Sequence, residues 1–303
     1  MYVLIISLIL LGVVAAIAGS IRNKRLRQKV ERGELEKMPE VKMVTDCGAE
    51  SCAVEEGGLC ELDCVLNGSK GIEYYDDEEL DRFKGKEGDA YMFRTGAEKL
   101  KNIGVVSARI DFCSMGENRY SRRNYGMKTL LKEAKCAFEY LSNLPQVDAQ
   151  RVGIMGHSLG GRVTFLSSGL PSKVLISLNG AINVTEDLPM KYDHEKMDRD
   201  GYVINETSDG RSELLFKRFY DELDECKSDT IYSYKNPIMV VVGLSDPTLN
   251  PEVSLGFVRN CGMDNVDLLT IEDANHTFNA KTGDFTKLNE MYDRLMPWVR
   301  EHL

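Results

Sequence analysis

The chain carries little positive charge. Its 38 lysine and arginine residues are outnumbered by 48 aspartate and glutamate residues, which gives a net charge of −10 at pH 7. The sequence has no basic stretch with interleaved aromatic residues to offset this balance, and contact with a phosphate backbone requires such a surface. The composition therefore argues against a nucleic-acid partner.

Histidine is also scarce, with four residues among 303. No glycine-rich loop of the kind that cradles a nucleotide phosphate is visible, so no cofactor is expected. The rest of the composition, 43% hydrophobic and 28% charged, is ordinary for a globular protein. A chain of this length and composition predicts one large domain with an appendage.

The most informative motif is the segment 156–160, Gly-His-Ser-Leu-Gly. Glycines two residues on either side of Ser158 remove the Cβ atoms that would clash where a strand turns sharply into a helix. Residues 152–155 read as a buried strand before the motif, and 162–168 can continue as a helix after it. This context predicts that Ser158 is a nucleophile and that the N–H of Leu159 faces a developing oxyanion. An ordinary glycine-rich turn is the alternative.

A serine nucleophile needs a neighbouring base, and that base needs a carboxylate to orient it. Only His276 follows the carboxyl end of a predicted strand, which is where catalytic groups gather in parallel sheets. We therefore predict His276 as the base. Asp246 holds the equivalent position after the preceding strand and is the predicted acid, with Asp273 as the alternative. The remaining histidines lie beside the serine, in an insertion and at the chain end: His157, His194 and His302.

From about residue 97 apolar runs alternate with helical patterns, which predicts an α/β fold with a mostly parallel sheet flanked by helices. A charged stretch at 183–229 is longer than most connections in such folds, and we expect it to form a cap. An extended surface excursion is the alternative. The expected strands are 104–111, 152–155, 173–178, 237–242 and 266–271, with an amphipathic helix over 125–144 and another at the chain end.

The chain order Ser158, Asp246, His276, together with this alternation of strands and helices, resembles the α/β-hydrolase family over about residues 99–303. Residues 108–118 resemble the family's R-x-D-F-x-G-x-G-x-S region, although Ser114 and Asn118 depart from it. Segments 243–247 and 275–278 resemble the acid and base loops of its esterase and serine-aminopeptidase-like branches. The resemblance implies a serine hydrolase that transfers an acyl group from a small ester or amide to water, and leaves esterase and peptidase open.

One part of the family pattern is not found in the sequence. The family places a third strand between those corresponding to 104–111 and 152–155, and the loop after it supplies a second oxyanion donor. Between residues 68 and 102 no apolar strand-like run occurs, and 91–93 is the only weak candidate. The sequence therefore predicts a sheet that lacks its N-terminal strands. A truncated, catalytically weak or inactive hydrolase-like module is the alternative to an active enzyme.

Residues 2–19 are uncharged, apolar and about long enough to span a bilayer. This predicts a transmembrane anchor at 1–21, with the catalytic domain on the cytoplasmic side by the positive-inside rule. A cleaved signal peptide is the alternative, because 16–18 resembles a cleavage site, but such peptides carry their charge before the apolar run. Here the basic residues follow it: Arg22, Lys24, Arg25, Arg27 and Lys29.

Residues 22–98 are expected to form an acidic linker region with a cluster of cysteines. The cluster lacks paired C-x-x-C spacing, and the acidic residues between its members disfavour thiolates. A metal site, disulfides and free thiols all stay open. The N-terminal part faintly resembles short bacterial single-span proteins of unknown function. The clustered cysteines are Cys47, Cys52, Cys60 and Cys64.

Overall fold

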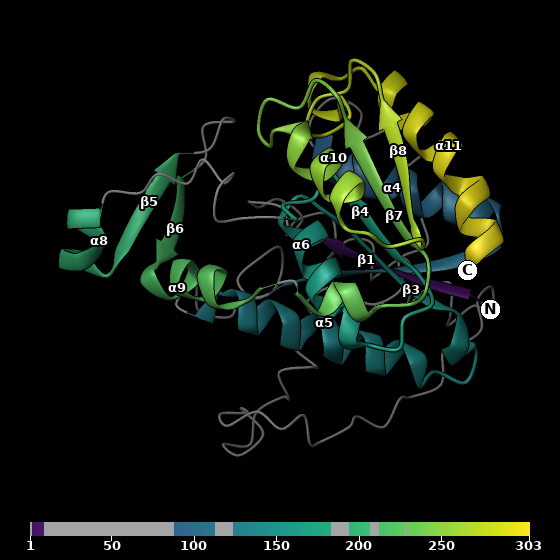
Figure 1. Ribbon diagram of the computed structural model, residues 1–303, viewed down its shortest axis with the longest axis horizontal. Helices are drawn as coiled ribbons and strands as arrows, with labels where there is room; N and C mark the ends of the chain where they lie inside the picture. The colour runs from purple at the N-terminus through teal and green to yellow at the C-terminus, as the bar shows by residue number, and fades with distance from the viewer. Residues whose placement is uncertain (1, 9–87, 113–123, 183–193, 207–211, 228) are drawn as a thin grey trace, which may run out of the picture.

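The computed structural model describes residues 2–8, 88–112, 124–182, 194–206, 212–227 and 229–303. At its centre is a six-stranded sheet in the order β2-β1-β3-β4-β7-β8 (Figure 1). All five neighbouring pairs are parallel, which confirms the expected sheet. The strands are β1 Tyr2–Leu8, β2 Val105–Asp111, β3 Val152–His157, β4 Leu175–Leu178, β7 Ile238–Gly243 and β8 Val266–Ile271.

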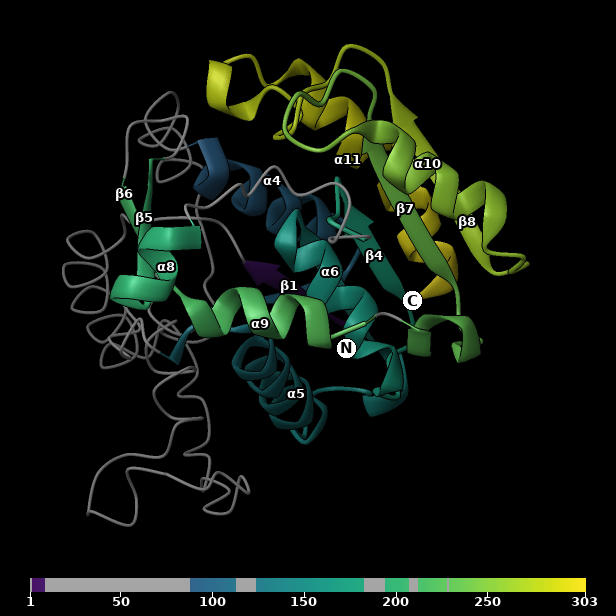
Figure 2. The same cartoon turned by 60° about the vertical axis from the view of Figure 1, so that its left-hand side comes forward.

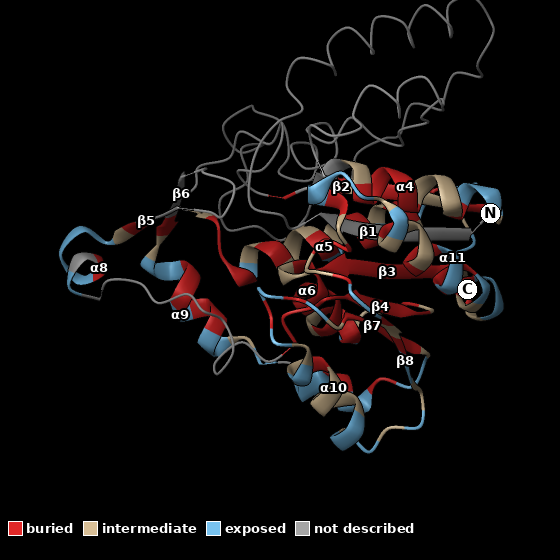
Figure 3. Ribbon diagram, turned by 90° about the horizontal axis from the view of Figure 1, so that it is seen from above, coloured by how far each residue is buried: buried red, intermediate tan, exposed pale blue. Residues whose placement is uncertain are grey.

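Helices cover both faces of the sheet, because successive residues of each strand point to opposite sides. In β7, Met239 and Val241 pack with the helices α4 and α11, whereas Val240 and Val242 pack with α5, α6 and α10 on the other face. Figure 3 shows the middle strands β3, β4 and β7 buried between these two layers. The helices are α4 Gly88–Asn102, α5 Met127–Ser142, α6 Leu159–Leu166, α10 Pro251–Asn260 and α11 Thr286–His302.

Two helices follow the apolar spacing of the sequence closely. Helix α5 lies within the predicted range 125–144, and its buried stripe includes Leu130, Ala134 and Phe138. In α11 the buried residues Leu288 and Leu295 recur at the spacing of one helix face. Both helices are confirmed. Short 3₁₀ helices occupy Ala149–Arg151, Ser167–Gly169, Asp229–Ser233 and Ala280–Thr282.

Strand β1 lies between β2 and β3. Its residues pair with β2 from Tyr2 opposite Val105 to Leu8 opposite Asp111, and residues 3–7 pair with β3. The prediction of a sheet without a strand at this place was wrong. Residues 2–8, which belong to the anchor expected at 1–21, form a strand here and not part of a helix. The rest of the apolar run, residues 9–19, lies outside the described residues.

The physical reason for this error is that one apolar run suits two environments. A central strand of a parallel sheet is covered on both faces, so it reads as a continuous apolar stretch, as a membrane span does. Among the helices that the structure describes, none combines the length and apolar character needed to cross a bilayer.

Helix α4 begins inside the stretch that was expected to be a linker. Residues 91–93, the weak strand candidate, lie within α4 and form no strand. Met92, Phe93 and Leu100 are fully buried in the cluster that α4 shares with α11 and the sheet. The cysteines at 47, 52, 60 and 64 and the family-like segment 114–118 lie outside the described residues.

The expected cap contains a helix, a hairpin and a second helix in its described part. Helix α8 spans His194–Asp200, the antiparallel strands β5 and β6 span Tyr202–Glu206 and Ser212–Phe216, and helix α9 spans Lys217–Glu225. In Figures 1 and 2 the hairpin and α8 extend away from the sheet, while α9 lies along α5. Residues 183–193, at the start of the insertion, lie outside the described residues.

Candidate active site

Ser158 lies on the sharp turn between β3 and α6. Its backbone angles, φ 55° and ψ −121°, fall outside the regions that residues other than glycine usually occupy. The turn is held from the neighbouring strand: the Ser158 N–H donates to the carbonyl of Leu178 at 3.0 Å, and its carbonyl accepts from the N–H of Ala181 at 3.0 Å. The strained turn that the motif predicts is therefore present.

The turn leaves no room for side chains at two of its glycines. A Cβ atom on Gly156 would lie 2.0 Å from the carbonyl oxygen of Gly160. A Cβ atom on Gly161 would lie 2.5 Å from the Cα atom of Gly180. Gly156 has the steric role that the motif predicts, whereas the role of Gly161 follows from the close approach of α6 to the end of β4.

The structure brings Ser158, His276 and Asp246 into one hydrogen-bonded row. The Nε2 atom of His276 lies 2.9 Å from the Oγ atom of Ser158, and its Nδ1 atom lies 2.7 Å from Oδ2 of Asp246. The His276 side chain is 14% exposed and that of Asp246 is 2% exposed. All three residues follow carboxyl ends of parallel strands, as the sequence analysis expected.

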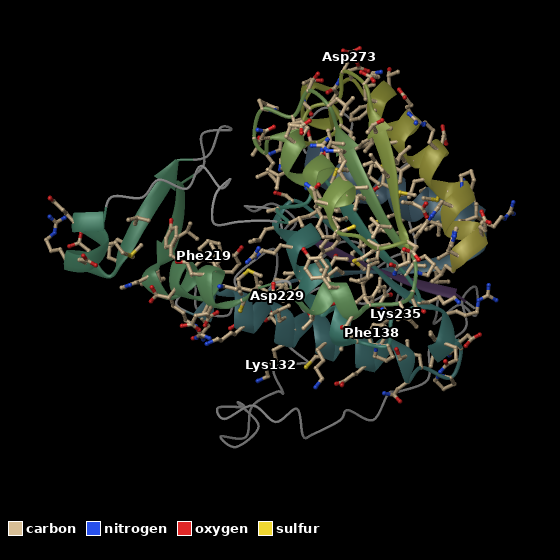
Figure 4. The ribbon with its side chains drawn as sticks, in the orientation of Figure 1. Lys132, Phe138, Phe219, Asp229, Lys235 and Asp273 are labelled. Atoms are coloured by element: carbon tan, nitrogen blue, oxygen red, sulfur yellow. The ribbon has the colours of Figure 1, made fainter. Side chains whose placement is uncertain are left out.

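Of the two candidate carboxylates, Asp246 is the one that contacts the His276 imidazole. Oδ1 of Asp246 accepts hydrogen bonds from the N–H groups of Thr248 at 2.8 Å and Leu249 at 3.0 Å, which leaves Oδ2 for the imidazole. Asp273 is exposed and lies at the rim of the molecule in Figure 4. Its main-chain carbonyl accepts from Asn279, 3.2 Å away, and this contact only shapes the loop.

The predicted oxyanion donor is the first residue of a helix. Leu159 opens α6, so its N–H has no acceptor within the helix and is free to face a substrate oxygen. Strand β1 ends at the same edge of the sheet, since Ser7 pairs with Gly156, two residues before the serine. The residues after Leu8 lie outside the described part of the chain.

Comparison with known proteins identifies the family to which this chain belongs. The model of the prolyl oligopeptidase family matches residues 114–303, which include all three residues of the row. The chain belongs to the prolyl oligopeptidase family. No curated protein matches the chain.

Solved structures share the fold at low sequence identity. Est1E from Butyrivibrio proteoclasticus with bound ferulic acid superposes with a TM-score of 0.60 at 20% identity, over 72% of this chain and 86% of that one. A monoacylglycerol lipase of Paleococcus ferrophilus gives 0.56 at 14%, over 70% and 89%. The α/β hydrolase GrgF from Penicillium sp. sh18 gives 0.56 at 15%, over 69% and 84%. The predicted α/β-hydrolase fold is confirmed.

In this member of the prolyl oligopeptidase family, His157 is a buried neighbour of the site. Its ring lies between Phe93 and His276, and its Nε2 atom donates to the main-chain carbonyl of His276 at 2.7 Å. Burial lowers the pKa of His157 well below the ordinary value of 6.5, and the nearby His276 and Lys281 act in the same direction. His157 is therefore neutral near pH 7, with its proton on Nε2.

A buried guanidinium group ties the cap to helix α6, which follows Ser158. Arg162, on α6, donates to the carbonyls of Leu223 at 3.1 Å and Cys226 at 2.6 Å, which lie at the C-terminal end of α9. It also donates to the carbonyl of Ile182 at 3.3 Å. A helix C-terminus carries a partial negative charge, so it suits a guanidinium group. No motif in the sequence marks this residue.

Apolar contacts join the cap to the residues around the serine. The rings of Tyr125 and Phe219 stack with centroids 5.2 Å apart, and Figure 4 shows Phe219 on the cap helix. The same apolar cluster reaches Leu159 beside the serine and Leu249 in the loop that holds Asp246. The described part of the cap thus packs on the elements that carry the site.

Proposed function

We propose that the protein is a serine hydrolase that cleaves an ester or acyl bond through an acyl-enzyme. The observation that carries the proposal is the row of Ser158, His276 and Asp246, with contacts of 2.9 Å and 2.7 Å. A serine hydroxyl becomes a competent nucleophile when a neighbouring base removes its proton, and the base works best when a carboxylate fixes its tautomer.

The reaction proceeds in two halves. Oγ of Ser158 attacks the substrate carbonyl carbon while its proton moves to Nε2 of His276, and Asp246 stabilises the imidazolium. The N–H of Leu159 donates to the oxyanion that forms. His276 then gives its proton to the leaving group, and an acyl-Ser158 ester remains. Water, deprotonated by His276, releases the acid and restores the serine.

The catalytic rate depends on whether a second oxyanion donor is present beside Leu159. Removal of one such donor costs about 10²- to 10³-fold in rate, so a site with Leu159 alone would be slow. Strand β1 lies between β2 and β3, the position of the strand that in the α/β-hydrolase family precedes the loop with the second donor. This placement favours an active enzyme over the alternative of an inactive hydrolase-like module.

A carboxylic ester is the substrate class that the similar structures support best, since two of them are described with ferulic acid and as a monoacylglycerol lipase. The family name favours a peptide as the second candidate. A panel of p-nitrophenyl esters and aminoacyl p-nitroanilides separates the two. We expect turnover of the esters that is lost in Ser158→Ala. Turnover of the anilides alone would assign a peptidase.

Membrane attachment is a further proposal, and the apolar run at 2–19 with basic residues after it favours it. Residues 2–8 cannot cross a bilayer as a helix and form strand β1 at the same time. Alkaline carbonate extraction of membranes from expressing cells tests the anchor. Full-length chain that stays in the pellet supports a single-pass protein with a cytoplasmic domain, and release into the supernatant supports strand β1.

A further inference from the structure

The side chain of Asn179 joins the loops that carry Asp246 and His276. Its Nδ2 atom donates to the main-chain carbonyls of His276 at 2.9 Å and Asn275 at 3.2 Å. Its Oδ1 atom accepts from the N–H of Gly243 at 2.7 Å, at the end of β7. The residue is 3% exposed and follows β4 directly. One buried amide thus contacts the end of β7 and the main chain of His276 itself.

The carbonyl of His276 receives a second side-chain donor. His157, the residue before Ser158, donates to it from Nε2 at 2.7 Å. Two buried side chains, one directly after β4 and one at the last residue of β3, therefore hold the main chain of the predicted base. These side-chain hydrogen bonds are additional to the main-chain hydrogen bonds of the sheet. The strands β4 and β7 pair through their main-chain groups, and the N–H of Asn179 itself donates to the carbonyl of Val241 at 2.8 Å.

We propose that Asn179 is a positioning residue that holds the His276 imidazole between Ser158 and Asp246. The imidazole meets both partners at once, at 2.9 Å and 2.7 Å, so a shift of its backbone lengthens at least one contact. A misplacement of about 1 Å in such a site can cost on the order of 10²-fold in rate. This inference rests on the proposed function.

The geometry of Asn179 explains why asparagine suits this place. Its φ of 41° is a left-handed conformation, which asparagine adopts more readily than most residues other than glycine. Its amide offers donors and an acceptor on one planar group, as the three contacts require. Replacement by glycine keeps the backbone allowed and removes only the amide.

The central experiment is a double-mutant cycle on the full chain with a p-nitrophenyl ester. We expect Asn179→Gly to lower kcat by about 10- to 100-fold and to change KM by less than about twofold, because only the base is displaced. In a His276→Ala background the same change should alter the residual rate by less than about twofold, since no base is left to position.

Asn265 provides a matched control. Its Nδ2 atom also donates to two main-chain carbonyls, those of Tyr234 at 3.1 Å and Asn236 at 2.7 Å, but at the opposite end of β7 and β8. We expect Asn265→Gly to lower the melting temperature without a change in kcat.

A wild-type kcat in Asn179→Gly would overturn the inference, as would an equal loss in both backgrounds, which would indicate a general structural role. If Asn179→Gly fails to fold, Asn179→Asp carries the test. Its protonated carboxyl group can still donate to the His276 carbonyl and its ionised form cannot, so kcat should fall as pH rises, unlike that of the wild type.

The positioning role would also be overturned if the pH profile of kcat in Asn179→Asp ran parallel to that of the wild type. Failure of both Asn179→Gly and Asn179→Asp to fold would overturn it as well. Failure of the proposed function is a separate result, since it would appear as a wild-type protein with no turnover that depends on Ser158.

Discussion

The Nδ1 atom of His276 lies 2.7 Å from Oδ2 of Asp246, while the other carboxylate oxygen is held by its own loop. An amide at this position would keep the shape but would not select the required imidazole tautomer. We therefore expect Asp246→Asn to lower kcat by about 10⁴-fold, measured with a p-nitrophenyl ester.

The control for this prediction is Asp273→Asn, which should keep the wild-type rate because Asp273 is exposed and does not face the imidazole. Near-normal activity of Asp246→Asn, or a large loss in Asp273→Asn, would show that the acid is wrongly assigned.

Acidification should weaken the fold through His157. Burial keeps its pKa well below 6.5 in the folded protein, whereas the unfolded chain binds the proton near the ordinary value. The free energy of unfolding should therefore be unaffected by His157 above pH 6.5 and fall below it, by up to about 1.4 kcal/mol per pH unit. Urea unfolding of wild type and His157→Gln from pH 7.5 to 5 measures this contribution.

The stability advantage of the wild type over His157→Gln should shrink as pH falls, because glutamine keeps a donor but does not titrate. A difference in unfolding free energy that stays constant across this range would contradict a neutral, buried His157.

Glu222 of the cap helix should stabilise α5. Its buried carboxylate accepts from the N–H of Lys128 at 2.8 Å and from Arg218 at 2.6 Å, at a helix start where Gly126 provides no side-chain cap. We expect Glu222→Ala to lower the free energy of unfolding by about 1–3 kcal/mol. Glu225→Ala removes only an exposed, solvent-screened ion pair with Lys128 and should cost much less than Glu222→Ala. Equal costs in urea unfolding would refute the capping role.

Strand β1 gives a test at the N-terminus. Ile5 pairs with both Ala108 and Ile154, and proline there removes an N–H from a central strand. We expect Ile5→Pro to lower the free energy of unfolding of the hydrolase domain by about 1–3 kcal/mol, and Ile5→Val to have little effect. A membrane helix tolerates proline and would leave this domain unchanged. Thermal unfolding of the full chain decides between the two.

The site was more predictable than the sheet around it. Ser158 lies in a local motif, and Asp246 and His276 follow short apolar runs whose length and spacing are typical of strands in a parallel sheet. Strand β1 was not predictable in this way, because an apolar run fits a central strand and a membrane span equally well.

The role of Asn179 depends on contacts with residues 64 and 97 positions away in the sequence, and no local pattern signals such contacts. Arg162 was missed for a similar reason, since its partners are main-chain carbonyls of the cap. Their roles became visible only when the tertiary structure placed these loops together.

Covalent labelling of Ser158 tests the central claim most directly. Folded full-length protein is treated with a fluorophosphonate, and the modified peptide is located by mass spectrometry. The proposed mechanism predicts one adduct, on Ser158, that is absent from Ser158→Ala and formed much more slowly by His276→Ala. Failure of the folded wild type to label, or labelling that persists in Ser158→Ala, would contradict it.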